Sequence, residues 1–170
     1  MDNSARLDDR PTVTLLSLSR FEEDHLALVR IFQDSKTSLY PGLRVAIARA
    51  WEPADAVTVV RASRIPIVIC DADQFAGGWQ QMALELRCVP EAPCLILASS
   101  VVDDRLGAEA SRHGAYDVLA KPLCAAEVLR MIKMAWLRWQ HKHRMTNPES
   151  ETQTGDSAGP ETGGITKEKP

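Results

Sequence analysis

Short apolar runs alternate with longer amphipathic segments along most of the chain. Several of the runs show almost no polar alternation, which is typical of strands that are covered on both faces of a sheet. The segments between them place apolar residues three and four positions apart, the spacing of one face of a helix. The pattern predicts strands at 13–19, 44–50, 65–71, 93–99 and 116–121, and helices at 22–32, 53–63, 79–87, 103–114 and 124–144.

Five repeats of strand and then helix predict an α/β fold. Parallel strands need crossover connections, and right-handed crossovers through helices cover both faces of a parallel sheet. Binding sites in such sheets lie beyond the carboxyl ends of the strands. Asp71 ends the third predicted strand, and Ser19, Ser99 and Lys121 end the first, fourth and fifth. We therefore expect these side chains to line one crevice.

The two ends of the chain depart from this pattern. The first ten residues are polar and lack the apolar region of a signal peptide, and no uncharged apolar run reaches membrane-spanning length. The stretch 146–170 has no aromatic residue and one isoleucine, too little apolar surface to offset the entropy of ordering. The sequence thus predicts a flexible start at 1–10, one domain at 11–145 and a disordered tail at 146–170, in a soluble cytoplasmic protein that does not associate with membranes.

Composition excludes several function classes. The chain is 45% apolar and 25% charged, as in ordinary globular proteins, and its net charge of -3 gives no reason to expect a nucleic-acid partner. The four cysteines form no Cys-x-x-Cys pair, and His141 and His143 are spaced so that they do not share a helix face, so we expect no metal site from them. We interpret His25 and His113 as helix-surface residues. The absence of a Gly-x-Ser-x-Gly turn argues against a hydrolase, and we expect no enzyme.

Three features in order resemble the receiver domain of two-component response regulators: Asp71 after the third predicted strand, Ser99 after the fourth, and GAYDVLAKP at 114–122. A lysine followed by proline, with glycine and alanine seven and six positions before the lysine, is the most specific part. The resemblance covers roughly residues 11–145. It implies a flavodoxin-like receiver fold, a doubly wound sheet of five parallel strands in the order 2-1-3-4-5.

The resemblance also implies a role for each site residue. Asp71 is the phosphoacceptor, Lys121 pairs with the phosphoryl oxygens, and Ser99 hydrogen-bonds one of them. The carbonyl of Asp73 helps to bind magnesium, and the bond from Lys121 to Pro122 is typically cis in the family. The implied function is that of a stand-alone receiver in two-component phosphorelay signalling. Its partner would be a sensor histidine kinase or another signalling protein, and its output would be protein–protein contact.

The first departure from the family pattern lies after the first predicted strand. Receivers carry two acidic residues there to bind magnesium, but this chain has Ser19 and Arg20. A shifted register could bring in Glu22 or Glu23, at the cost of a longer loop. Because magnesium prefers carboxylate oxygens in octahedral geometry, we expect it to bind weakly or not at all. We expect Arg20 to supply the missing positive charge beside Asp71.

Two further departures leave the function open. Phe75 stands where the family has proline four residues after the aspartate, and Val118 stands where it has a switching aromatic residue. The main hypothesis is an atypical receiver that is phosphorylated on Asp71. The alternative is a phosphorylation-independent interaction or dimerisation module with the same fold. A small-molecule-binding flavodoxin-like domain is a third hypothesis, and no loop sequence favours it.

The last predicted helix is apolar on more than one side. Helices that bury one face do not need a second apolar side, and exposed apolar area usually marks a contact. We therefore predict a partner interface at Met134 and Leu137, which could serve a homodimer. The core side is assigned Val128, Leu129, Ile132, Ala135, Trp136 and Trp139, and the second side Met131, Met134 and Leu137.

Overall fold

The computed structural model of the chain describes residues 12–34 and 44–144. In this part of the chain five strands and five helices alternate, as the sequence predicts. The predictions for 1–10 and 146–170 lie outside the described residues. The strands are β1 (Thr12–Leu18), β2 (Arg44–Ala50), β3 (Ile67–Asp71), β4 (Cys94–Ser99) and β5 (Asp117–Ala120), and the helices are α1 (Glu22–Asp34), α2 (Pro53–Ala62), α3 (Gly78–Arg87), α4 (Asp104–His113) and α5 (Ala125–Arg144).

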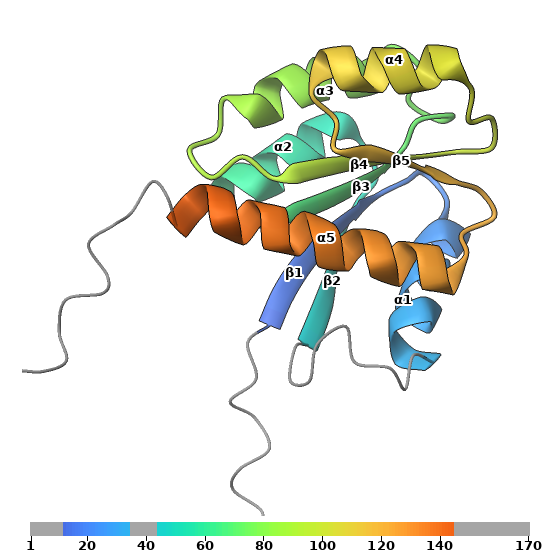
Figure 1. The fold of residues 1–170 in the computed structure, drawn as a ribbon, viewed down its shortest axis with the longest axis horizontal. Helices are drawn as coiled ribbons and strands as arrows, with labels where there is room; N and C mark the ends of the chain where they lie inside the picture. The colour runs from blue at the N-terminus through green and yellow to red at the C-terminus, as the bar shows by residue number, and fades with distance from the viewer. Residues whose placement is uncertain (1–11, 35–43, 145–170) are drawn as a thin grey trace, which may run out of the picture.

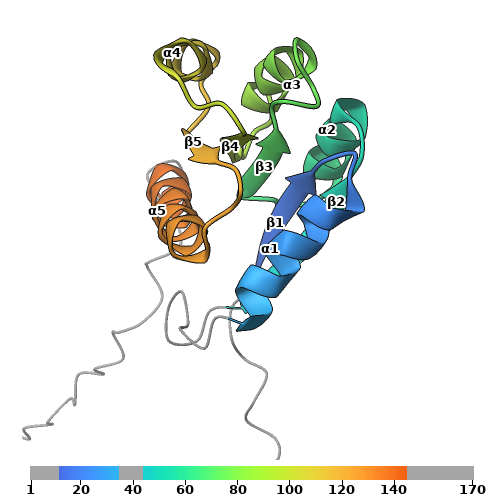
Figure 2. The ribbon, with the colours of Figure 1, turned by 90° about the vertical axis from the view of Figure 1, so that its right-hand side faces the viewer.

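The strands form one parallel sheet in the predicted order β2-β1-β3-β4-β5. Helices α1 and α5 cover one face, and α2, α3 and α4 cover the other (Figure 1, Figure 2). All five strands run in the same direction, so the residues that end the strands gather along one edge. The register pairs Leu18 with Cys70, Asp71 with Ala98 and Ser99 with Ala120.

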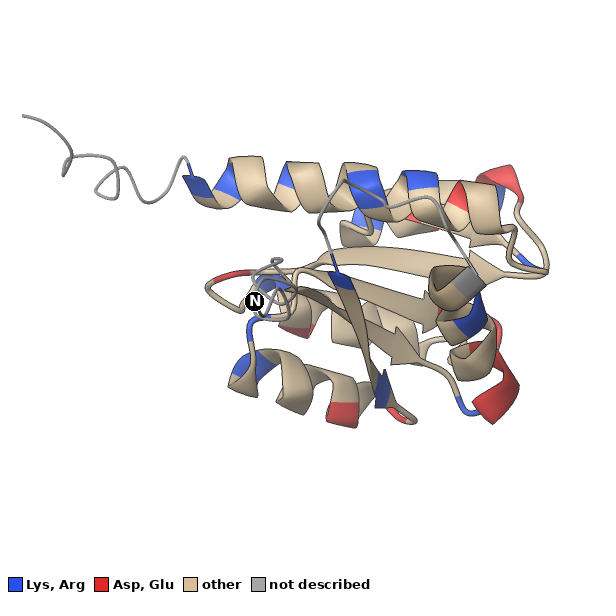
Figure 3. Ribbon diagram, turned by 90° about the horizontal axis from the view of Figure 1, so that it is seen from below, with Lys and Arg blue, Asp and Glu red and all other residues tan. Residues whose placement is uncertain are grey.

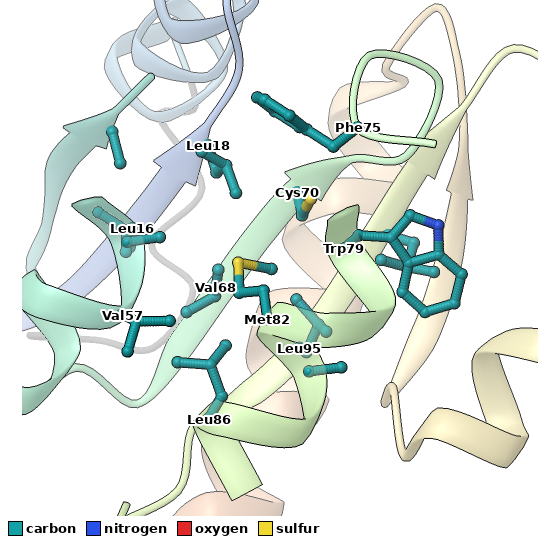
Figure 4. Packing of buried hydrophobic residues seen from close by; sticks show 14 of the residues in the cluster. Leu16, Leu18, Val57, Val68, Cys70, Phe75, Trp79, Met82, Leu86 and Leu95 are labelled. Atoms are coloured by element: carbon teal, nitrogen blue, oxygen red, sulfur yellow. The ribbon is translucent and has the colours of Figure 1, made fainter. Parts of the chain in front are cut away.

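Two apolar clusters fill the spaces between the sheet and its helices. All five residues of β3 are buried, which explains the continuous apolar sequence of this central strand. Each large side chain removed from water in this way contributes about 1.5–3 kcal/mol to folding. The cluster under α2 and α3 includes Leu16, Val57, Val68, Trp79, Met82, Leu86 and Leu95 (Figure 4), and the cluster under α1 and α5 includes Leu15, Leu28, Ile67, Ile96 and Ile132.

Helix α4 begins and ends at the residues that the sequence indicates. The side chain of Asp103 accepts a hydrogen bond of 2.7 Å from the backbone N–H of Leu106 and caps the helix. Gly114 ends it with φ of 78°, a left-handed conformation that favours glycine. These two ends set the length of the loop that follows β4 and the approach to β5.

Helix α5 departs from prediction at Leu129 and Met131. Leu129, which the sequence assigns to the core side, is only partly buried and belongs to neither apolar cluster. Met131 is 3% exposed and belongs to the core, because it faces the sheet together with Val128 and Ile132. Met134 and Leu137 are 49% and 36% exposed, as the second apolar side requires.

Among the helices of 12–34 and 44–144, none combines the length and the apolar character needed to cross a membrane.

Candidate functional site

Asp71 and Lys121 meet at the carboxyl edge of the sheet. Asp71 is the last residue of β3 and is buried, and Lys121 follows β5. Lys121 Nζ donates to Asp71 Oδ2 over 2.5 Å. The backbone N–H of Lys121 donates to the Ser99 carbonyl over 2.8 Å, and the peptide bond to Pro122 is cis. The predicted convergence of Asp71 and Lys121 is confirmed.

Both carboxylate oxygens of Asp71 are hydrogen-bonded. Oδ1 accepts from the backbone N–H groups of Asp73 and Gln74, at 2.9 and 3.4 Å, which is the pattern of an Asx turn. Oδ2 accepts from Lys121 Nζ and from the side-chain amide Nε2 of Gln74. A buried carboxylate needs such partners because it has lost its water. Asp71 is therefore both a turn residue and part of a charged site.

A second carboxylate, Asp24 in the first turn of α1, enters the site. Its Oδ2 accepts from Ser19 Oγ over 2.6 Å and from Gln74 Nε2 over 3.0 Å, and it lies 3.5 Å from Lys121 Nζ. The hypothesis that a shifted register brings Glu22 or Glu23 into the site is wrong. The acid that enters the site is Asp24, and Glu22 pairs with Arg49 on the surface. Asp24 precedes the buried Leu28 by four residues, so helical periodicity alone places both on one face.

Charge pairing shifts the pKa of both Asp24 and Lys121. Burial raises the pKa of Asp24, but the Ser19 hydroxyl and the Lys121 charge outweigh this and leave the pKa lowered. Burial lowers the pKa of Lys121, but the hydrogen bond and charge of Asp71, with the charge of Asp24, leave it raised. Both shifts favour the ionised forms. In the pocket, Lys121 Nζ lies against side-chain oxygens of both Asp24 and Asp71.

The prediction that Arg20 supplies charge to Asp71 is wrong. The Arg20 guanidinium binds Glu52 through two hydrogen bonds of 3.1 and 3.0 Å, and it lies over the Phe75 ring at 4.9 Å from the centroid. Both charged side chains are about half exposed. Pairing there keeps the guanidinium hydrated, whereas entry into the pocket would remove its water. Only the backbone N–H of Arg20 reaches the site, where it donates to Gln74 Oε1 over 2.6 Å.

The Ser99 hydroxyl points to Asp73 instead of to Asp71, so the predicted convergence of Ser99 with the other two side chains is not observed. Its Oγ lies 2.6 Å from Asp73 Oδ1 and 3.0 Å from the carbonyl oxygen of Val101. Asp73 Oδ2 accepts from the backbone N–H and the hydroxyl of Ser100, at 2.8 and 2.5 Å. Although burial acts against it, these bonds lower the pKa of Asp73. The Asp73 side chain thus ties the loop after β3 to the loop after β4.

His25 is fully buried, so its interpretation as a surface residue is wrong. Its Nε2 lies 3.1 Å from the Ser19 carbonyl oxygen, and its Nδ1 lies 2.8 Å from Ser17 Oγ. Because a carbonyl oxygen only accepts, Nε2 must carry the hydrogen, and Nδ1 of the neutral ring then accepts from the Ser17 hydroxyl. The edge-on Trp51 ring, 5.1 Å away, covers it. His25 holds in place the backbone that presents Ser19.

The arrangement of these residues does not fit a magnesium ion. The cavity between Ser19, Asp24, Asp71 and Lys121 has a volume of about 20 Å³, enough for one water molecule. Magnesium usually retains several waters in octahedral geometry. The position between the oxygens is also taken, because Gln74 Nε2 contacts Ser19, Asp24 and Asp71. Across 12–34 and 44–144, no three His, Cys, Asp or Glu side chains gather as a metal site.

The sheet order, the helix layers and the position of Asp71 and Lys121 at the strand ends define the class of fold: the chain has the fold of response-regulator receiver domains. It is similar to a response regulator from Thermotoga maritima, with 21% identity, TM-score 0.59, and coverage of 73% of this chain and 97% of that chain. It is also similar to the signal receiver domain of an HD domain-containing protein from Pseudomonas fluorescens Pf-5, with 19% identity, TM-score 0.63, and coverage of 84% and 98%.

A third similar structure is the signal receiver domain of a DNA-binding response regulator from Colwellia psychrerythraea 34H, with 17% identity, TM-score 0.59, and coverage of 74% and 98%. No protein-family model and no curated protein sequence matches the chain. At these identities the similarity establishes the fold, and the chemistry rests on the residues of the site.

Proposed function

We propose that the chain is a receiver-type signalling protein whose phosphoacceptor is Asp71 and whose output is contact with another protein. The observation that carries the proposal is the 2.5 Å contact between Lys121 Nζ and Asp71 Oδ2 at the carboxyl edge of a receiver-fold sheet. This contact puts a cation beside the carboxylate that would receive a phosphoryl group. The phosphodonor would be a sensor histidine kinase or another signalling protein.

In the proposed reaction, a carboxylate oxygen of Asp71 attacks the phosphorus atom of the donor. A new oxygen–phosphorus bond forms while the bond from phosphorus to the donor nitrogen or oxygen breaks, and the electron pair of that bond leaves with the donor. The Lys121 ammonium group would stabilise the charge on the phosphoryl oxygens. The attacking oxygen must first give up one of its present hydrogen bonds, so we expect phosphorylation to be slow.

The two other expected participants need rearrangement. Ser99 would have to leave Asp73 before its hydroxyl could reach a phosphoryl oxygen on Asp71. Magnesium would meet a pocket that Gln74 already fills. We therefore infer weak magnesium binding by the native chain.

A second candidate function is a phosphorylation-independent interaction module. The observation in its favour is that all the hydrogen-bonding positions around the Asp71 carboxylate are used within the chain. Such a module would act through its surface, and the exposed Met134 and Leu137 on α5 are the proposed contact. The two candidates differ in whether Asp71 ever carries a phosphoryl group.

The test is to incubate the full chain with acetyl phosphate or phosphoramidate, with and without magnesium, and to measure its intact mass. The phosphoacceptor proposal expects the slow gain of one phosphoryl group, which Asp71→Asn abolishes. The exposed Asp104 offers a matched control, because Asp104→Asn should leave the gain unchanged. No gain with either donor, or a gain that survives Asp71→Asn, would overturn the proposal and favour the interaction module.

A further inference from the structure

Gln74 sends its side-chain amide into the middle of the acidic pocket. Nε2 lies 3.0 Å from Ser19 Oγ and 3.0 Å from Asp24 Oδ2, and it also donates to Asp71 Oδ2. These three oxygens come from the loop after β1, from α1 and from the end of β3. We propose that the Gln74 amide is a built-in substitute for a cation: it plugs the pocket and holds the site in a form that excludes divalent metal ions.

The orientation of the amide follows from its hydrogen bonds. The backbone N–H of Arg20 lies 2.6 Å from the other amide atom, Oε1. An N–H group can only donate, so the oxygen must face Arg20 and the nitrogen must face the carboxylates. A flipped amide would oppose donor to donor on one side and acceptor to acceptor on the other. The backbone after β1 therefore fixes which end of Gln74 enters the pocket.

Gln80 and Gln81, the two glutamines of α3, lack this set of contacts. Gln81 is exposed and reaches a single carboxylate, that of Glu85, at 3.4 Å. Gln80 donates to Glu109, but its Oε1 has no partner. Gln74 uses both ends of its amide and joins three segments of the fold. A side chain on the surface of a turn would not need these bonds.

The chemistry of the pocket explains why an amide can work here. Two carboxylates face one ammonium group, so one negative charge is left over. A metal ion would neutralise that charge but would need several oxygens and water molecules around it. The amide carries no net charge, yet its N–H groups add donors to carboxylate oxygens that otherwise have only the Lys121 ammonium group and the Ser19 hydroxyl.

Removing the amide should therefore open a latent cation site. In Gln74→Ala, the oxygens of Ser19, Asp24 and Asp71 lose a shared donor, and space becomes available between them. In Gln74→Glu, a third carboxylate enters the same position, and three carboxylates with one lysine favour a divalent cation. This inference rests on the proposed function only for its effect on phosphorylation, and metal binding tests it separately.

The experiment is titration of the full chain with Mn²⁺, followed by the paramagnetic resonance signal of the free ion, and with Mg²⁺, followed by calorimetry. We expect Gln74→Glu to bind Mn²⁺ at least about tenfold more tightly than the native chain, with Gln74→Ala between them. Gln81→Glu adds the same charge on an exposed surface and should bind like the native chain. Asp24→Asn in the Gln74→Glu background should remove the gain.

A measurement on the native chain does not depend on the variants folding. The side-chain amide resonances of Gln74 should show slow hydrogen exchange and should not shift when Mg²⁺ is added. Native-chain binding as tight as that of Gln74→Glu, or a Mg²⁺-induced shift of the Gln74 amide at low concentration, would overturn the inference. If the metal titrations give the expected result but no variant is phosphorylated, the proposal that Asp71 is a phosphoacceptor would be overturned. The inference about Gln74 would stand.

Discussion

His25 affects the site from within the fold, without facing the pocket. Burial lowers its pKa, and the charge of Arg49 acts in the same direction, whereas Glu22 and Asp24 act in the opposite one. In the unfolded chain the ring has its ordinary pKa near 6.5. Below that pH the unfolded state binds more protons than the native state. The contribution of His25 to the free energy of unfolding should therefore be fully present above about pH 6.5. It should be lost as the pH falls from there through the lowered pKa of the folded state.

The first prediction concerns His25→Gln. Glutamine keeps one donor and one acceptor but does not titrate, so the variant should lose this pH dependence while it folds normally. Urea unfolding measured from about pH 5 to about pH 8 checks this. His141 is exposed, and His141→Gln is the control that should keep the native slope. Equal slopes in the native chain and His25→Gln would show that another group causes the dependence.

Asp73 supports a second residue-scale prediction, because it bonds Ser99 and Ser100 at once. Asp73→Ala removes these bonds and should lower the free energy of unfolding by about 1–3 kcal/mol. Hydrogen exchange at the Ser100 amide should become faster, because that N–H loses its acceptor. Asp73→Asn retains an oxygen acceptor, so its stability and its exchange rate should lie between those of the native chain and those of Asp73→Ala. Unchanged exchange in Asp73→Ala would mean that the loop after β4 is held by other contacts.

At the scale of elements, short local patterns carry most of the information. Short apolar runs marked all five strands, and the most continuous runs belong to β3 and β4, which are covered on both faces. The range 103–114 predicted for α4 ends on its two caps, the Asp103 side chain and the left-handed Gly114. The element that carries an unpredicted site residue is α1. Its first turn contains three acids, Glu22, Glu23 and Asp24, and each stabilises a helix start equally well by its charge. Only the angular position around the helix decides that Asp24 is the one that faces the pocket.

The cap of α4 gives a prediction for an element. Asp103→Ala leaves the Leu106 N–H without its acceptor and should cost about 1 kcal/mol of stability. Asp104→Ala, one position further on, removes an acidic charge near the helix start and should cost less, about 0.3–1 kcal/mol at low salt. Urea unfolding of both variants compares the two losses. A larger loss in Asp104→Ala would show that charge, and not the cap, stabilises this end.

At the scale of the whole molecule, the fold could be predicted from sequence and the site only in part. Strand–helix alternation leaves few arrangements of a parallel sheet, so the positions of Asp71 and Lys121 at one edge follow from chain order alone. The partners of long flexible side chains do not follow in this way. Arg20 can reach several carboxylates, and hydration decides that it binds Glu52. Gln74 has no local pattern that marks it, because its partners come from segments far apart in sequence.

The outer side of α5 combines apolar and basic residues. Met134 and Leu137 are exposed, and lysine and arginine residues recur along the same helix (Figure 3). Two copies that paired through α5 would bury the apolar residues but would also bring cations together. The predicted homodimer should therefore be weak at low salt and tighter as added salt screens the repulsion. The charged residues of the helix are Glu127, Arg130, Lys133, Arg138, Lys142 and Arg144.

The corresponding prediction is that changing Met134 and Leu137 together to Glu abolishes self-association while the fold is kept. The two carboxylates would have to be buried in the contact, where they lose hydration, so the dimer should weaken at least about tenfold. Sedimentation over a range of protein and salt concentrations measures the mass, and circular dichroism checks the fold. Leu84 on α3 is 48% exposed on the opposite face of the sheet, and Leu84→Glu is the matched control that should leave association unchanged. A native chain that is monomeric at all concentrations and salts, or a double variant that still dimerises, would contradict an α5 homodimer.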